Sequence, residues 1–500
     1  MTGHRLRESD PGRHWCSGQD EKREGVTKSE LESHRWAHLA STHRGFAFKG
    51  PRDPQGRIEE QPWGNAYELC IVSGPVDIVR FARAVRKVVR RQLAFRGRFA
   101  RRNGEDVFAT AEGPLLKLRT LRRGSVSGGS ADEASVWVHK TLARCAGKPF
   151  RLQHDPLTRV VLAEDADDRW RMLIVQDHSI SDGWTLKLLT NAVMQEYRRD
   201  SSVVSSDRRL EPCGYDSSYF DWYEGPGQIE REPAEAARKT WQAIADDTSL
   251  LAARPVIPGG RWVPRANRLQ DRLFLYRFTA DEEHRLKVRA EWLGCGLADL
   301  LLTSVQLAML AITRVCPPIS YIYSGRRAPS VWRVMGLFCE EMLTVPLPAS
   351  DCDPLDQWMR RFLGRNHPRP SLGNLSVFDI HSARSEENLV THFNFLPLRR
   401  TIQTDTGVRL DPATREEYEA LTTPPLSNRF GIAVKVWDSA ERAMELSVSV
   451  DHRICPRPDR AALAMLYGAL VDGETRISMS EAIETVRSLW SGTMSARKTV

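Results

Sequence analysis

A strand that passes at once into a long amphipathic helix is the feature that most constrains the fold of this chain. Residues 65–73, NAYELCIVS, have the composition of a strand, which Gly74-Pro75 ends. In residues 76–95 the apolar side chains recur at helical spacing, while Arg and Lys occupy the opposite side. Asp77 falls in the first turn of this helix, where a carboxylate favours the helix dipole. The pair is typical of a domain in which helices cover a sheet.

Strands and helices alternate along the rest of the chain as well. The apolar patterns predict further strands at residues 157–163, 170–176, 271–278, 319–324, 432–437 and 444–450. They predict further helices at residues 28–43, 131–146, 184–198, 280–292, 297–314 and 460–471. A hairpin is expected over residues 96–113, with Asn103-Gly104 as its turn. This alternation, without a short internal repeat, predicts an α/β (or α+β) protein with two lobes.

Composition and charge exclude several classes of protein. The chain has 500 residues, 41% of them hydrophobic and 27% charged, which is close to the globular norm and leaves enough apolar material for sizeable cores. The net charge of +8 comes without zinc-finger spacing, an RNP-like aromatic run or a long basic tract, so we expect no nucleic-acid partner. The nine cysteines form no CxxC pair, so we expect neither a metal site nor a disulfide framework.

The apolar segments do not have the pattern of a leader or a membrane anchor. The first twenty residues are polar and lack an apolar core. The most apolar stretch, residues 297–313, is shorter than about 18 residues and contains Asp299 and Gln306, so it predicts a buried helix. We therefore expect no membrane partner and a cytoplasmic location.

The segment with the clearest chemistry is residues 171–189, RMLIVQDHSISDGWTLKLL, in which an apolar strand leads into a helix. His178 stands at the end of the strand, and Asp182 follows four residues later with Gly183 allowing a tight turn. A histidine in such a place can be held in one tautomer by the backbone, which leaves Nε2 to accept a proton. The alternative is a structural histidine and a helix-capping aspartate at a strand-to-helix junction.

The surroundings of this segment favour the chemical interpretation. HSISDGW resembles the second half of the HHxxxDGW signature of nonribosomal peptide synthetase condensation domains, which belong to the chloramphenicol-acetyltransferase-like acyltransferases. Further segments resemble family segments and follow in the family's order: residues 74–99, 148–162, 323–348 (YSGRRAPSVWRVMGLFCEEMLTVPLP) and 392–397 (HFNFLP). The resemblance extends over about residues 28–480.

The resemblance implies the architecture of the chain. The family has two similar lobes, each a mixed sheet with flanking helices, which form a V with a tunnel between them. We accordingly expect an N-terminal lobe over residues 28–205, carrying the HxxxDG motif, and a C-terminal lobe over residues 206–485. Residues 1–27 and 486–500 are expected to be tails, the first of them disordered.

The resemblance also implies roles for three residues of the motif and for one arginine. His178 would lie at the midpoint of the tunnel and take the proton of the attacking nucleophile. Asp182 would point away from the tunnel and form a structural ion pair with Arg326, or else with Arg327; a surface contact is the alternative for Arg326. Gly183 would keep the tunnel clear and offer its N–H to the developing oxyanion.

Four further residues are candidates for the tunnel lining. Asp177 stands where the family has its first histidine, and Glu340 stands where the family has the asparagine of an FVN segment. Trp184 and Asn394 are the other two, although a structural role for Trp184 and a strand-pairing role for Asn394 are alternatives.

The resemblance implies a free-standing condensation enzyme. It would transfer an acyl or aminoacyl group from the phosphopantetheine thioester of an acyl or peptidyl carrier protein to a small-molecule amine or hydroxyl acceptor. No bound cofactor and no metal are implied. One alternative is an acyltransferase of the same superfamily with acyl-CoA as donor. Another is a catalytically silent recruitment module, suggested by Asp177.

A second histidine motif needs a separate interpretation. Asp451-His452-Arg453 resembles the start of the DHRxxDG signature of dihydrolipoamide acyltransferases, but Pro456 and Arg457 stand in place of its Asp-Gly. We therefore expect His452 to be structural.

Overall fold

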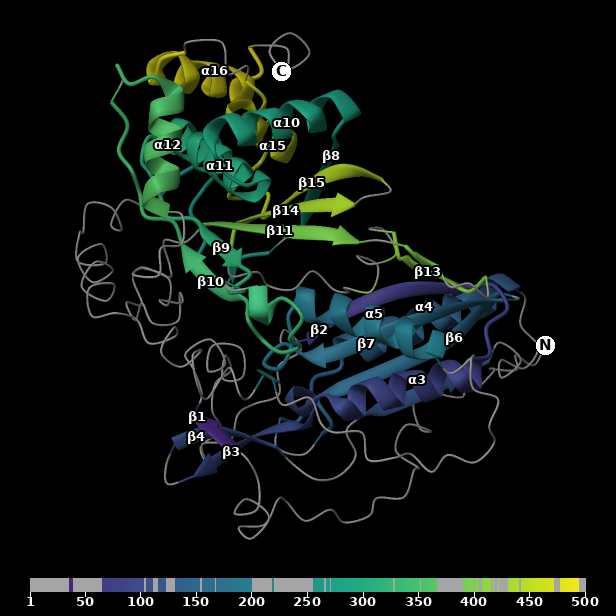
Figure 1. Cartoon of the computed structure of the whole chain (residues 1–500). Helices are drawn as coiled ribbons and strands as arrows, with labels where there is room; N and C mark the ends of the chain where they lie inside the picture. The colour runs from purple at the N-terminus through teal and green to yellow at the C-terminus, as the bar shows by residue number, and fades with distance from the viewer. Residues whose placement is uncertain are drawn as a thin grey trace, which may run out of the picture.

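In the part of the chain that the structure describes, two lobes form, each built on a six-stranded sheet (Figure 1). The computed structural model describes residues 36–38, 65–102, 105–110, 116–122, 131–152, 155–166, 168–199, 218–219, 255–264, 267–269, 271–326, 329–350, 352–366, 390–399, 401–403, 407–414, 417, 421, 430–439, 442–471 and 477–493. The predicted tail at residues 1–27 lies outside these residues.

The N-terminal lobe is centred on a sheet that contains the predicted strand at residues 65–73. Its sheet has the order β12-β13-β2-β7-β6-β5, and only the β5–β6 pair is parallel. The strands are β2 (Asn65–Ser73), β5 (Lys117–Leu121), β6 (Thr158–Ala166), β7 (Arg169–Asp177), β12 (Ile402–Gln403) and β13 (Arg409–Pro412). The register pairs Asn65 with Asp177, so the start of β2 lies beside the end of β7.

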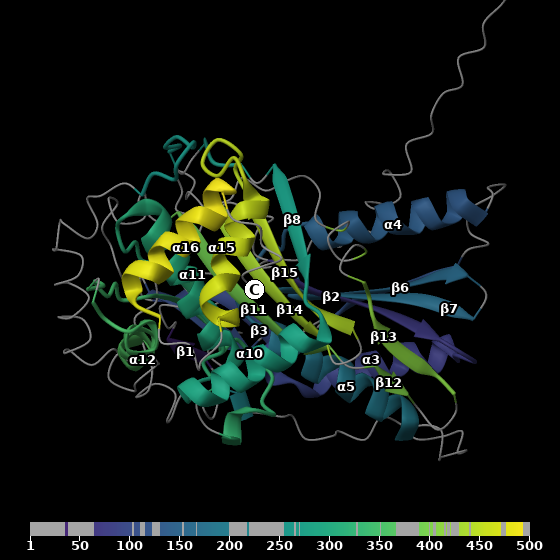
Figure 2. The same ribbon diagram turned by 90° about the horizontal axis from the view of Figure 1, so that it is seen from above.

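Among the described residues, three helices cover this sheet, because each carries an apolar face that must be buried. Figure 2 shows α4 (Ala131–Gly147) on one side of β6 and β7, and α3 (Ile78–Arg91) and α5 (Gly183–Arg199) on the other. Asp77 is the N-cap of α3 and not part of its first turn: its side chain accepts the N–H groups of Val79 and Arg80. A cap satisfies amides that a helix start leaves without acceptors.

A small sheet forms from β1 (Trp36–His38), β3 (Gly97–Arg102) and β4 (Glu105–Thr110). The strands β3 and β4 confirm the predicted hairpin, although its turn at residues 103–104 lies outside the described residues. The predicted helix over residues 28–43 is wrong at residues 36–38. There the pairing of β1 with β4 decides the conformation, which shows tertiary contacts overriding a local pattern.

The C-terminal lobe has the strand order β10-β9-β11-β14-β15-β8. Its strands are β8 (Arg272–Arg277), β9 (Ser320–Tyr323), β10 (Glu340–Leu343), β11 (Thr391–Arg399), β14 (Ile432–Ser439) and β15 (Arg442–Val450). Its helices are α10 (Ala280–Leu293), α11 (Leu297–Thr313), α12 (Leu355–Asn366), α15 (Pro458–Leu470) and α16 (Met479–Ser491). The helices lie together on the side of the sheet away from the N-terminal lobe (Figure 1).

The predicted buried helix is α11, which contacts α15 and α16 and lies in the core of this lobe. Within the described residues, no single helix has the length and hydropathy needed to cross a bilayer. Only α10 and α11 taken together, bent by 91° at their break, reach those limits.

The two faces of the C-terminal sheet differ in chemistry. Strand registers and the alternation of side chains put Tyr321, Met342, Phe393 and Val434 on one face, where they belong to the core under the helices. The opposite face, which is turned toward the N-terminal lobe, carries Ser320, Glu341, His392, Asn394, Lys435 and Ser447. The face turned toward the N-terminal lobe therefore carries polar side chains among apolar ones such as Ile322 and Leu343.

The predicted lobe boundaries need two corrections. Strands β12 and β13, at residues 402–412, join the N-terminal sheet by pairing with β2, and Val331, Val334 and Phe338 pack in the N-terminal core. The second correction concerns the predicted tail at residues 486–500. Helix α16 continues to Ser491, because its apolar side, including Val486, is buried against the C-terminal core.

Candidate active site

The predicted functional histidine lies in the turn that follows β7. Residues 178–180 form this turn, which the hydrogen bond from the Ile180 N–H to the Asp177 carbonyl closes at 3.1 Å. The side chain of His178 is partly exposed, whereas the residues on both sides of it are buried. The strand end thus brings one imidazole to the boundary of the core, and its predicted place in a tunnel stays a prediction.

Asp177 is buried beside this histidine. Its carboxylate accepts the N–H of Ser179 at 2.9 Å and the Ser179 hydroxyl. Burial raises the pKa of the Asp177 carboxyl to about 6, against the opposing effect of these two hydrogen bonds. The residue that replaces the family's first histidine therefore titrates close to neutral pH, as an imidazole would.

Asp182 anchors the other end of the turn. It directly precedes α5, and its Oδ1 accepts the N–H of Thr185 at 2.7 Å, as a helix-capping aspartate does. Its Oδ2 accepts the N–H groups of Phe338 at 2.9 Å and Cys339 at 3.3 Å. The carboxylate therefore joins α5 to the segment that leads into β10.

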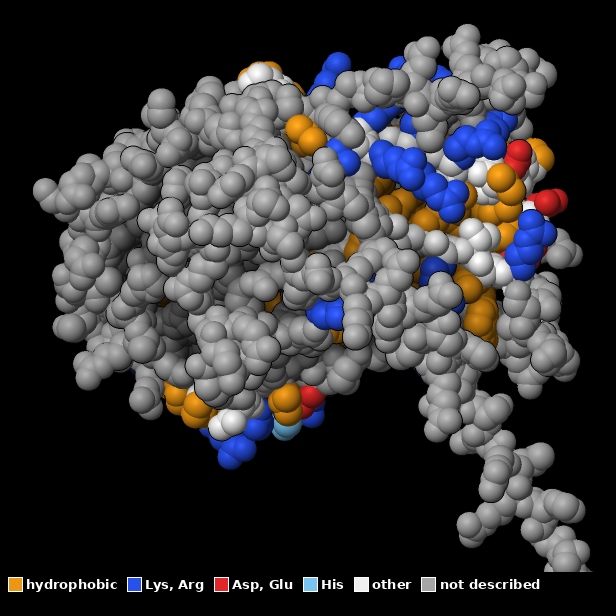
Figure 3. Space-filling view, turned by 90° about the horizontal axis from the view of Figure 1, so that it is seen from below, with side chains coloured by type: hydrophobic (Ala, Val, Ile, Leu, Met, Phe, Trp, Pro, Cys, Tyr) orange, Lys and Arg blue, Asp and Glu red, His pale blue; other side chains and the backbone are white. Residues whose placement is uncertain are grey.

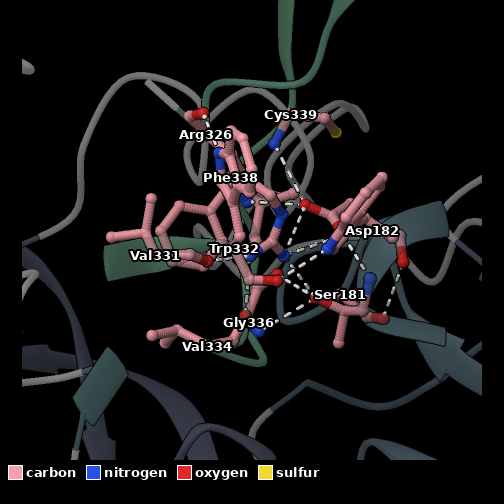
Figure 4. A network of polar contacts seen from close by, with 12 residues as sticks. Ser181, Asp182, Arg326, Val331, Trp332, Val334, Gly336, Phe338 and Cys339 are labelled. Atoms are coloured by element: carbon pink, nitrogen blue, oxygen red, sulfur yellow. Dashed lines mark hydrogen bonds and ion pairs between the residues drawn. The ribbon is translucent and has the colours of Figure 1, made fainter. Parts of the chain in front are cut away.

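Arg326 forms the predicted ion pair with Asp182 (Figure 4). Nη2 lies 3.3 Å from Oδ1 and 3.4 Å from Oδ2, and each side chain is only 3% exposed. Nη1 donates to the carbonyls of Val331 and Val334, both at 2.7 Å, and the guanidinium lies 4.0 Å from the ring centroid of Phe338. The alternative of a surface contact for Arg326 is wrong, and Arg327 lies outside the described residues.

Thr185 is a member of this network that the sequence analysis missed. Its hydroxyl donates to the Gly336 carbonyl at 2.6 Å and accepts the Gly336 N–H at 3.0 Å and Arg326 Nη2 at 2.9 Å. A threonine in the first turn of a helix gives no sequence signal for such a role. Together Asp182, Arg326 and Thr185 hold residue 326 and residues 331–339 against the start of α5.

Two glycines allow this segment to approach so closely. Gly325 has φ +65°, and a Cβ there would lie 1.8 Å from the Phe338 carbonyl oxygen. A Cβ on Gly336 would lie 2.0 Å from the ring of Tyr219, whose hydroxyl donates to the Leu337 carbonyl at 3.2 Å. Gly183 differs from both: it is exposed, and a Cβ there would have no atom within 4 Å. Packing therefore explains Gly325 and Gly336, but not Gly183.

The remaining tunnel-lining candidates occupy different positions. Trp184 is 38% exposed, and its indole N–H donates to the Trp332 carbonyl at 2.8 Å, which favours the structural alternative. Asn394 lies in β11 on the sheet face turned toward the N-terminal lobe. Glu340 pairs with Tyr323 and so lies on the helix-covered face, whereas Glu341 lies on the face of Asn394. The register thus favours Glu341 over Glu340 as the glutamate of the lobe-facing wall, because side chains alternate along a strand.

His452 contributes to a polar cluster on the C-terminal lobe. Its N–H and Nδ1 both bind Asp271, next to Asp451. The three side chains are close enough to share a metal ion, but the Asp451 carboxylate already binds the Arg453 side chain and the Leu269 N–H. A guanidinium beside the carboxylate opposes a cation, so this cluster fits the structural role predicted for His452.

The fold thus has two lobes, each a sheet covered by helices, and a histidine turn that is held by the neighbouring Asp182 carboxylate and by a guanidinium from a distant part of the chain. Residues 65–361 match the Condensation domain family. This chain belongs to that family.

Individual relatives agree with the assignment. The chain is 29% identical over 134 residues to gramicidin S synthase 2 of Aneurinibacillus migulanus, covering 27% of this chain and 3% of that protein. It is 27% identical over 195 residues to the phosphinothricin tripeptide synthetase PhsB of Streptomyces viridochromogenes, covering 34% of this chain and 16% of that protein. It therefore spans a small part of these relatives' length.

Solved structures agree with the fold. The condensation domain of the Monacolin K polyketide synthase MokA has a TM-score of 0.65 at 12% identity, covering 89% of this chain and 99% of that one. The first condensation domain of the calcium-dependent antibiotic synthetase, in complex with substrate analogue 2a, has a TM-score of 0.63 at 14% identity, with coverages of 89% and 99%. The epimerization domain of tyrocidine synthetase B has a TM-score of 0.63 at 14% identity, covering 94% and 100%. The fold is thus common to both kinds of domain.

Proposed function

We propose that this chain is a condensation enzyme that joins an acyl or aminoacyl thioester to an amine, or to a hydroxyl, in the biosynthesis of a peptide-like natural product. The donor is the phosphopantetheine thioester of a carrier protein. The observation that carries the proposal is the buried ion pair between Asp182 and Arg326, which fixes the turn that contains His178. A turn held this firmly keeps an acid–base group in one place during a reaction between two substrates.

His178 acts as the general base in this proposal. The acceptor nitrogen attacks the thioester carbonyl carbon, and His178 takes the proton that this nitrogen loses. The tetrahedral intermediate then collapses, the carbon–sulfur bond breaks, and the departing thiolate takes the proton back from the imidazolium. The product is an amide and a free thiol, with no covalent bond to the enzyme.

Gly183 leaves space for the donor and offers an amide to the oxyanion. Neither packing nor a left-handed backbone requires glycine here, since a Cβ would have no atom within 4 Å. Its N–H belongs to the first turn of α5, where the amides have no acceptor within the helix and the dipole favours negative charge. A Gly183→Ala variant should therefore fold normally and lose turnover.

The test compares His178→Ala with the wild-type enzyme. Acyl transfer to a small primary amine from an acyl carrier protein, measured by mass spectrometry of the product, should fall by about 10²- to 10⁴-fold. His452→Ala is the matched control, and it should keep wild-type turnover. Unchanged turnover in His178→Ala would contradict the proposal, because the reaction would then not need His178. Absence of turnover in the wild type as well would instead favour the silent recruitment module.

The identity of the donor is tested by competition. Purified enzyme receives acyl carrier protein and free acyl-CoA, each with a different isotope label in the acyl group, and the label in the product is counted. The proposal expects the carrier-bound label to dominate. Equal use of both labels would instead identify an acyltransferase that takes acyl-CoA.

A further inference from the structure

A second histidine lies on the face of the C-terminal sheet that is turned toward the N-terminal lobe, in a strand that follows the Asp182–Arg326 ion pair along the chain. His392 in β11 pairs in register with Ser320 in β9, and Glu341 lies on the same face in β10. Strand β10 follows Cys339, whose N–H binds Asp182, and Glu341 is two residues farther on, about 7 Å along the strand. This Ser320–Glu341–His392 cluster therefore lies on the sheet face that is turned toward the N-terminal lobe, next along the chain from the segment that Asp182 binds.

The contacts within the cluster fix the position of the imidazole protons. The Ser320 hydroxyl donates to Glu341 Oε1 at 2.8 Å, and Ser320 Oγ lies 3.1 Å from His392 Nδ1. Because a serine hydroxyl has only one proton, the imidazole must donate in the second contact. Nδ1 is thus the protonated nitrogen, and in the neutral ring Nε2 is the basic one. Phe430 stacks on the ring at 4.7 Å between centroids and fixes its plane.

The cluster has the residue types of a hydrolytic triad but not its geometry. A nucleophilic serine must be reachable and must give its proton to the histidine. Here Ser320 is fully buried and gives its proton to the carboxylate. The side chain of His392, by contrast, is 14% exposed and Glu341 is 3% exposed, with 4.0 Å between Nδ1 and Oε1. The imidazole is therefore the member that a ligand can reach, and the carboxylate supports it from within.

We propose that His392 is a second proton acceptor of the condensation site, which binds an acceptor that arrives as a primary ammonium ion. This inference rests on the proposed function. An ammonium nitrogen has no lone pair, so it must lose one proton before it can attack. That proton moves to His392 Nε2, which leaves a neutral amine and an imidazolium. The amine then attacks the thioester, and His178 takes the second proton and passes it to the thiolate. His392 releases its proton to solvent after the product leaves.

The buried Glu341 carboxylate lowers the cost of this proton transfer, which runs uphill because a primary ammonium ion is a weaker acid than an imidazolium ion. An ionised carboxylate in a buried place stabilises a positive charge beside it, and the imidazolium is 4.0 Å away through Ser320. Lys435 in β14 is a charged residue on the same face, across from Asn394, and it is exposed. Glu445 in β15 and Arg277 in β8 lie farther along this face and pair with each other. Tyr321 and Tyr323 in β9 and Glu340 in β10 lie on the opposite face.

The first test observes the imidazole directly and needs no turnover. In the 15N spectrum of the full chain, the His392 resonances are identified by their loss in His392→Asn. We expect the Nδ1–H tautomer, a shift of the Nε2 resonance when ethylammonium chloride is added, and no such shift with ethanol. Glu341→Gln should abolish the response to ethylammonium. An Nε2–H tautomer, or a His392 resonance that ethylammonium does not move, would overturn the inference.

The second test separates the two histidines by their substrates. The donor is an acyl-N-acetylcysteamine thioester, and the acceptors are ethylamine, an ammonium ion at neutral pH, and 2,2,2-trifluoroethylamine, which its fluorines keep neutral. His392→Asn keeps a donor for Ser320, and we expect kcat/KM to fall about 100-fold with ethylamine but little with trifluoroethylamine. His452→Asn, the same substitution at a histidine that also binds a carboxylate, should change neither value.

The outcomes distinguish this inference from the proposed function. His178→Ala should lose turnover with both amines, since both pass through the same attack. If His178→Ala is active, the proposed function fails, whereas the spectrum of His392 still decides whether ethylammonium binds there. If His178→Ala is inactive and His392→Asn reacts with ethylamine like the wild type, the role of His392 is wrong and that of His178 stands.

Discussion

Asp182 and Arg326 form a buried ion pair across 144 positions of the chain, and each carries hydrogen bonds to the segment that the other belongs to. The carboxylate accepts two amides from residues 338–339, and Nη2 of the guanidinium binds Thr185 in α5. If either side chain is removed, the other remains inside the protein as an unpaired charge.

The first prediction concerns the loss of the carboxylate. Asp182→Ala leaves Arg326 as an uncompensated buried charge, and we expect the free energy of unfolding to fall by about 3–5 kcal/mol. Urea unfolding followed by circular dichroism measures it. Asp271→Ala, which removes an exposed carboxylate from the outer cluster, serves as the control and should cost far less. A variant as stable as the wild type would mean that the ion pair does not hold the fold.

The second prediction concerns Thr185. Thr185→Val keeps the shape but removes the hydroxyl that both Gly336 groups and Arg326 use. We expect a loss of about 2–3 kcal/mol of stability, since buried polar groups lose their partners. Thr185→Ser restores the hydroxyl and should recover most of the loss. If the serine and valine variants unfold at the same denaturant concentration, the hydroxyl is not responsible.

The third prediction is a pH dependence set by Asp177. Its carboxyl has a pKa of about 6 in the folded chain and an ordinary value of 3.8. The folded state therefore holds this proton more tightly than the unfolded state, and stability falls as the pH rises from about 4 to above 6. Asp177→Asn removes this loss of stability, because an asparagine does not ionise. At pH 8 the variant should therefore be more stable than the wild type, by at most about 3 kcal/mol. At pH 4 the two should agree.

Thermal unfolding of Asp177→Asn and of the wild type at a series of pH values measures this difference in stability. Asp165→Asn is a suitable comparison, because that carboxylate is paired with Arg171 at 3.1 Å and should lose stability on substitution. A constant difference between Asp177→Asn and the wild type across the pH range would show that Asp177 does not titrate there.

The fourth prediction concerns the close approach before Arg326. Gly325→Ala places a Cβ 1.8 Å from the Phe338 carbonyl oxygen at φ +65°, so the segment must shift. We expect a loss of about 2–4 kcal/mol and lower acyl transfer, because Arg326 is displaced. Gly364→Ala in α12 meets no atom within 4 Å and should be neutral or stabilise the helix by about 1 kcal/mol. Equal stability of the two variants would contradict the tight fit.

Much of the fold could be predicted from local patterns. The strand at residues 65–73, the hairpin of β3 and β4, and the helices α4, α5, α10, α11 and α15 follow from periods of two and 3.6 residues. Helix α16 was missed, although Ser478 and Glu481 form a capping box that was readable in the sequence. Strand β13 was also missed, because its partner β2 lies more than 300 positions earlier and gives no local signal.

The residues of the candidate site likewise fall into two groups, those that the sequence predicted and those that it did not. His178, Asp182 and Gly183 were visible because they are consecutive in one strand–turn–helix segment, and Arg326 was visible through a second segment in the expected order. The roles of Thr185 and of the Ser320–Glu341–His392 cluster were not visible in the sequence. Each depends on which strand lies beside which, and on which face a side chain takes.

The sequence by itself determined where strands and helices form and which short segment carries the reactive imidazole, because backbone conformation and burial periodicity act between neighbouring residues. Only the tertiary structure decided that a late strand completes the first sheet and that a glutamate, a serine and a histidine share one polar wall. Hydrogen bonds between distant strands set those relationships, and their register exists only once the chain has folded.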